Sequence, residues 1–157
     1  MKFFPKACFL FCFFVALRLA LFNLDAAEWG DSYHLLRGAK ELTHLSYPLD
    51  EKRLPGFSAF IAPFLFVFEP VFAGKLVVAL ATLAVLILSY KLSQKLFPES
   101  TWHLWVPILL CLSPVFLYWS IRVMAIMPFT ALVILAFFIF YSYRSGALVK
   151  RLPLDKL

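Results

Sequence analysis

Four apolar stretches dominate the chain, and each approaches the length that a helix needs to cross a lipid bilayer. A transmembrane helix takes about 20 predominantly apolar residues, because the hydrocarbon core is about 30 Å thick. The stretches cover residues 7–24, 71–90, 104–119 and 123–143. A helix satisfies its backbone hydrogen bonds within one segment, as lipid requires. The pattern therefore predicts an all-α polytopic membrane protein with about four transmembrane helices.

The composition excludes an ordinary soluble domain. Hydrophobic residues make up 63% of the chain and charged residues 15%, whereas soluble domains are about half apolar and about a quarter charged. The basic residues lie at the ends of apolar stretches and form no patch interleaved with exposed aromatics, so we expect no nucleic acid partner. The three cysteines lie inside apolar stretches and the three histidines are scattered, so no zinc site is expected.

A fifth apolar stretch, residues 55–68, is too short to span. Its 14 residues would cover about 21 Å as a helix, less than the hydrocarbon core. It contains Pro55, Gly56 and Pro63. We expect a short re-entrant or interfacial helix here.

Basic residues predict the orientation in the membrane, because cytoplasmic loops are enriched in Lys and Arg. A four-span topology with an uncleaved first span gathers eight of them on one side. They are Lys2, Lys6, Lys91, Lys95, Arg144, Lys150, Arg151 and Lys156. Both termini and the tail 144–157 are therefore expected in the cytoplasm of a plasma (inner) membrane protein, with loop 25–70 on the outer face.

The outer loop holds six of the nine acidic residues, all between positions 25 and 53. From position 32 to 45, five apolar residues recur at helical spacing, and polar residues take the other face. The apolar residues are Leu35, Leu36, Ala39, Leu42 and Leu45. The pattern predicts an amphipathic helix on the outer membrane surface, in contact with membrane lipids, with Asp31 or Ser32 as its N-cap.

Three acidic residues are candidates for a general base. Asp31 fits either a helix cap or a carboxylate that deprotonates an acceptor hydroxyl or amine, and the two roles are compatible. Glu28 and Asp25 are alternatives, although a solvated loop charge explains each equally well. Asp31 and His34 at i, i+3 can also share a divalent metal ion, but two ligands without a third leave that site open.

Four cations need an explanation in this topology. Arg53 and Arg122 each fit an interfacial arginine or a contact with an anionic lipid-linked substrate, since the guanidinium fork suits phosphate oxygens. Arg18 lies inside the first span, where we expect it to face protein or water. Lys75 lies near the outer start of the second span, and we expect it to reach the interface.

Three motifs occur in order along the outer side of the chain. Residues 31–40 nearly match an Asp-x-Tyr-x-x-x-Ala helix, and Tyr47-Pro48 is followed by an Arg-x-Pro-Gly-aromatic element at 53–57. Residues 113–120 read Ser-Pro-x-Phe-x-x-x-Ser. Together they resemble the N-terminal part of the GT-C membrane glycosyltransferases, especially the bacterial branch related to protein O-mannosyltransferases and lipid A aminoarabinose transferases.

The resemblance implies a GT-C-like module that transfers a sugar, with inversion, from a polyprenyl-phosphate donor to a lipid, glycan or protein acceptor on the outer face. It implies Asp31 as general base, with Glu28 as the alternative. Arg53, Arg122, Tyr33 and His34 would hold the substrate and its phosphate. Some relatives add a divalent metal, and no other cofactor is implied.

Two departures from the family pattern favour a rival. Family members often read Arg-x-Met-x-Glu-x-Pro after the third motif, and here Ile126 replaces the acid. The chain also covers only part of a complete enzyme, so we expect a fragment of a longer protein. The rival is a truncated, non-catalytic small integral membrane protein of the same fold. A transporter is a third reading, although no pair of broken helices in matching halves supports it.

Overall fold

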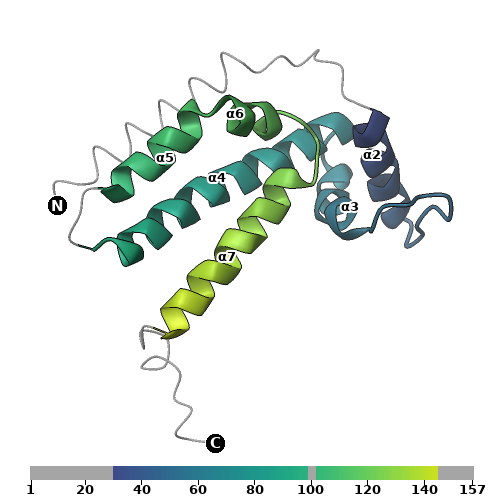
Figure 1. Cartoon of the computed structure of the whole chain (residues 1–157). Coiled ribbons are helices and arrows are strands. Elements are labelled where there is room, and N and C mark those ends of the chain that lie inside the picture. The colour runs from purple at the N-terminus through teal and green to yellow at the C-terminus, as the bar shows by residue number, and fades with distance from the viewer. Residues whose placement is uncertain (1–29, 99–101, 145–157) are drawn as a thin grey trace, which may run out of the picture.

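The computed structural model describes residues 30–98 and 102–144, and this part of the chain is entirely helical in its regular structure (Figure 1). The elements are α2 (Gly30–Leu42), α3 (Gly56–Ile61), the 3₁₀ helix η1 (Ala62–Phe66), α4 (Pro70–Leu96), α5 (Trp102–Leu112), α6 (Pro114–Ser120) and α7 (Ile126–Arg144). The all-helical prediction is confirmed. The predicted first span, Arg18, Asp25 and Glu28 lie outside the described residues.

Helix α4 is the central element, and α5 and α7 lie along it (Figure 1). Its 27 residues rise about 40 Å at 1.5 Å per residue. Pro70 begins it at a position where the missing N–H costs no hydrogen bond. Within the described residues, α4 and the 19-residue α7 are long and apolar enough to cross a membrane. They correspond to the second and fourth predicted spans.

The third predicted span is not one helix. Helix α5 ends before Ser113, which has an extended backbone conformation. The Ser113 hydroxyl accepts a hydrogen bond from the Phe116 amide at 3.4 Å and so caps the next helix. Pro114 then begins α6, because its ring fixes a helical φ but offers no N–H to continue α5. The prediction of a single helix over 104–119 was therefore wrong.

Helix α2 packs on α3 and on the first turns of α4. Leu35, Leu36 and Ala39 are buried, so the apolar face of α2 packs against protein, whereas the sequence predicted that it faces lipid; its place at the membrane surface stays a prediction. Leu45 is not on that face: it follows the helix with φ 56° and is 98% exposed. The short segment α3–η1 is helical, as the sequence predicted.

Gly74 lets three segments meet at the start of α4. A Cβ atom there would lie 2.6 Å from Cγ1 of Val123 and 3.0 Å from Cδ2 of Leu36. The turn between α6 and α7 and helix α2 therefore both press against the backbone of α4. Lys75, the next residue, is 4% exposed, so its side chain is buried in the protein and the expectation that it reaches the interface was wrong.

The opposite end of α4 contacts the start of α5 and the end of α7. Lys95 donates to the Ser142 hydroxyl and lies over the Phe138 ring, 4.6 Å from its centroid. The Tyr90 ring makes an edge contact with His103 at 5.7 Å. These contacts hold α5 and α7 beside α4 at the end remote from α2 and α3 (Figure 1).

Candidate functional site

Arg53 is the centre of a charge network between α2 and the loop that leads to α3. Its Nη2 donates to Oδ1 of Asp31 in a very short contact, and its Nη1 donates to Oε1 of Glu51 at 2.9 Å. Asp31 lies in the first turn of α2, which begins at Gly30, so neither Asp31 nor Ser32 is the N-cap. A carboxylate there is favoured by the helix dipole.

Glu51 is the least exposed member of this network, with its side chain 4% exposed. The Arg53 amide donates to Oε1 at 3.1 Å, and Nδ1 of His34 lies 3.4 Å from Oε2. Burial raises the pKa of Glu51, but the hydrogen bonds and positive charge of Arg53 outweigh it and hold that pKa below its ordinary value. Glu51 is therefore a fixed anion that positions both Arg53 and His34.

The backbone beneath Arg53 is held by Tyr47. Its hydroxyl donates to the Arg53 carbonyl at 3.0 Å, and its ring packs against Gly38, where a Cβ would lie 2.9 Å from Cε2. The Ser58 hydroxyl donates to the Leu35 carbonyl at 2.9 Å and ties α3 to α2. The Tyr-Pro motif thus shapes the loop that presents Arg53.

A second ion pair orders the outer edge of the loop. The Arg37 fork donates to both carboxylate oxygens of Asp50, at 3.0 and 3.3 Å. These hydrogen bonds lower the pKa of Asp50. Because both side chains are more than half exposed, we assign this pair a role in loop order and not in chemistry.

Arg122 lies in the turn between α6 and α7, with its guanidinium over the Tyr118 ring at 4.6 Å from the centroid. The same turn reaches α2, since the Ser32 hydroxyl lies 3.9 Å from the Met124 sulfur. Arg122 therefore belongs to the end of the fold that carries Asp31 and Arg53. Ile126, which stands where the GT-C sequence pattern often has an acid, begins α7 as a partly exposed apolar residue.

The predicted site residues fall into two groups. Asp31, His34 and Arg53 lie in one network, whereas Tyr33 has no contact in it and lines a separate hollow with Arg37. Sequence reasoning missed Glu51, whose carboxylate contacts both His34 and Arg53. The only signal in the sequence was its position two residues before Arg53, on a loop where no periodicity shows which side chains meet.

The metal site left open by Asp31 and His34 is not assembled in this arrangement. Asp31 binds Arg53, and His34 lies against Glu51. Among residues 30–98 and 102–144, no three His, Cys, Asp or Glu side chains gather in a way that holds a metal ion.

Comparisons with known proteins leave the family open. No family model matches the chain, and neither the curated proteins nor the solved structures contain a match. The functional assignment therefore depends on the motifs and on the geometry of the site.

The low pKa of Glu51 predicts how the loop responds to acid. A carboxylate whose folded pKa is lowered adds stability above its unfolded pKa, near 4.5, and this stability is lost as pH falls through the folded pKa. We expect the hydrogen-exchange protection of the Arg53 amide, corrected for intrinsic rate, to fall as pH is lowered from 7 to below 4.5. Glu51→Gln should have low protection throughout, and a wild-type profile in that variant would contradict the role of the carboxylate.

Proposed function

We propose that this chain is a membrane module of a GT-C-like glycosyltransferase. It moves a sugar from a polyprenyl-phosphate donor to a lipid, glycan or protein acceptor at the outer face of the membrane. Asp31 acts as the general base and Arg53 binds the donor phosphate, with Arg122 at the same end of the fold.

The contact between Asp31 and Arg53 carries this proposal. The two residues come from separate motifs, and the resemblance to the GT-C glycosyltransferases implies complementary roles for them as base and phosphate ligand. They lie in direct contact, with side chains 52% and 36% exposed, so substrates reach both. With inversion the acceptor and the leaving phosphate lie on opposite sides of one anomeric carbon, so the base and the phosphate ligand belong to one site and are separated there by the bound sugar.

The contact also implies an order of events. The phosphate of an incoming donor competes with Asp31 for the Arg53 fork, and Glu51 retains the guanidinium through Nη1. Asp31 is then released to take the proton of the acceptor hydroxyl or amine. The acceptor atom bonds to the anomeric carbon, and the bond to the phosphate oxygen breaks with its electron pair, which Arg53 stabilises on the leaving group.

The distribution of charge along α4 supports an outer location for this site. Lys91 and Lys95 lie in the last turns of α4, and Arg144 ends α7 beside them. Asp31 and Arg53 are at the opposite end. With Lys91, Lys95 and Arg144 in the cytoplasm, the candidate site opens at the outer interface, where a lipid-linked donor presents its phosphate.

The proposal is tested by turnover with the intact gene product. Membranes are supplied with labelled polyprenyl-phosphate sugars, and transfer of label to any acceptor is measured. Failure with every sugar would favour the non-catalytic alternative. In an active protein, Arg53→Lys keeps the charge but loses the fork, so we expect the donor KM to rise about tenfold. Arg37→Lys, at the Asp50 pair, is the matched control and should leave KM unchanged.

A further inference from the structure

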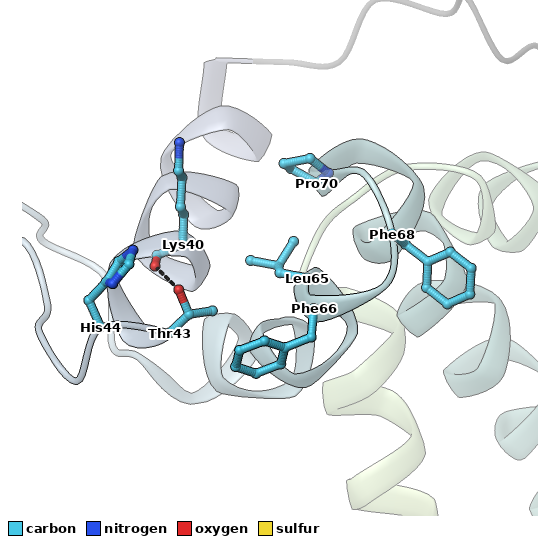
Figure 2. Close-up of a pocket in the computed structure, with 7 residues that line it drawn as sticks. All are labelled: Lys40, Thr43, His44, Leu65, Phe66, Phe68 and Pro70. Atoms are coloured by element: carbon cyan, nitrogen blue, oxygen red, sulfur yellow. Dashed lines mark hydrogen bonds between the residues drawn. The ribbon is translucent and has the colours of Figure 1, made fainter.

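A small hollow lies between the last turns of α2 and the junction of η1 with α4 (Figure 2). Its volume is about 180 Å³. It is lined by Lys40, Thr43, His44, Leu65, Phe66, Phe68 and Pro70. One wall is polar and basic and comes from the end of α2 and the turn that follows it, while the other is apolar and belongs to the segment that enters the membrane-length helix α4.

The polar wall continues a stripe along α2. Tyr33, Arg37 and Lys40 are spaced i, i+4 and i+7 and therefore share one face of the helix, and His44 lies in the turn that follows Leu42. Asp31 and His34 point to a different face. Lys40 and His44 are exposed and make no ion pair within the part of the chain that the structure describes.

Lys40 also borders a second hollow of about 390 Å³, on the side toward the start of α2. Tyr33, Arg37 and Glu69 contribute to its lining. Arg37 is held by Asp50, and Glu69 lines this second hollow but not the first. An anion is therefore best accommodated on the Lys40–His44 side, away from the carboxylate of Glu69.

The apolar wall continues into an exposed ridge, defined by Phe66, Val67 and Phe68. Phe66 is 77% exposed and Val67 76%, which is costly for large apolar side chains in water. The ridge ends two residues before Pro70, where α4 begins. Since α4 has membrane-spanning length, its first residue lies near the interface, and the ridge lies at the level where headgroups meet acyl chains.

We propose that the hollow binds the headgroup of an anionic glycerophospholipid. The Lys40 ammonium pairs with the phosphate, the His44 ring N–H and Thr43 hydroxyl are polar neighbours, and the acyl chains lie along the Phe66–Phe68 ridge. Cationic charge above an apolar ridge complements such a lipid better than a soluble anion, which has no acyl chains for the ridge, or a zwitterionic headgroup, whose own cation offsets the phosphate. The site stands on residues other than those of the proposed sugar transfer, and neither depends on the other.

The test uses the full chain in neutral detergent, mixed with equal amounts of phosphatidylglycerol and phosphatidylcholine. Lipids retained by the protein are counted by native mass spectrometry. Wild type should prefer phosphatidylglycerol, and Lys40→Gln should reduce that preference about fivefold. Phe66→Ser should reduce retention of both lipids, because it removes the contact with acyl chains.

Lys52→Gln is the matched control, since it removes one exposed positive charge from the same outer loop without touching the hollow. It should retain the wild-type preference. An unchanged preference in Lys40→Gln would overturn the proposal. An equal loss in both lysine variants would also overturn it, because net charge alone would then explain the selectivity.

Discussion

Asp31→Asn is expected to lower kcat for sugar transfer by about 10²–10⁴-fold, the usual contribution of a positioned general base. Asparagine keeps the size and a hydrogen-bond acceptor for Arg53, so α2 and the loop should remain folded. The asparagine amide cannot take the proton from the hydroxyl or amine of the sugar acceptor. Donor KM should fall or stay near that of wild type and should not rise, because the phosphate no longer displaces a carboxylate from the Arg53 fork and Glu51 still holds the guanidinium through Nη1. Both constants are measured with the sugar donor that gives turnover in wild type.

Asp50→Asn is the control for that substitution. Asp50 belongs to the same loop and also pairs with an arginine, Arg37, but it lies outside the network of Asp31, Arg53 and Glu51. Its kcat should stay near that of wild type. If Asp31→Asn retains full activity at normal expression, Asp31 is not the base. If both variants lose activity equally, loop order and not proton transfer is the cause.

The long apolar helices were the most predictable part of the fold, because length and hydropathy are properties of one segment. The second and fourth predicted spans are α4 and α7, although α4 continues to Leu96. The division at Ser113 was only partly predictable. A proline near a helix end can produce a bend or a break, and here the Ser113 hydroxyl caps a new helix and so favours the break.

The environment of α2 could not be predicted from its pattern. A face containing Leu35, Leu36 and Ala39 fits lipid and protein equally well, because hydropathy does not distinguish them. The choice depends on Gly74, which allows Leu36 to approach the backbone of α4. A glycine at one position of a long apolar helix carries no sign of which segment will lie against it.

The site was predictable in its residue types but not in its connections. Asp31 and Arg53 were identified from separate motifs, and their ion pair joins positions 22 residues apart. Glu51 and His34 were not expected to meet. Such contacts depend on the course of an irregular loop, which has no periodic sequence pattern. That course is fixed by the packing of the Tyr47 ring against Gly38 and by the hydrogen bond from the Tyr47 hydroxyl to the Arg53 carbonyl.

Gly74→Ala is expected to destabilise the fold, although alanine is the better helix former by about 1 kcal/mol. The added methyl would lie 2.6 Å from Cγ1 and 3.1 Å from Cγ2 of Val123. Overpacking of this kind costs about 1–3 kcal/mol, and the backbone of α4 cannot withdraw without moving α5 and α7. We expect the apparent Tm in detergent to fall by roughly 3–10 °C. Gly56→Ala is the control, since nothing lies within 4 Å of its added carbon.

A double substitution separates this clash from other effects of alanine at position 74. Val123→Ala removes both methyl groups that the new carbon would strike, so Gly74→Ala/Val123→Ala should be more stable than the sum of the two single changes predicts. Additive losses would mean that Gly74 is needed for another reason. Because Leu36 shares this contact and belongs to the helix that carries Asp31, the double variant should also recover any sugar transfer lost in Gly74→Ala.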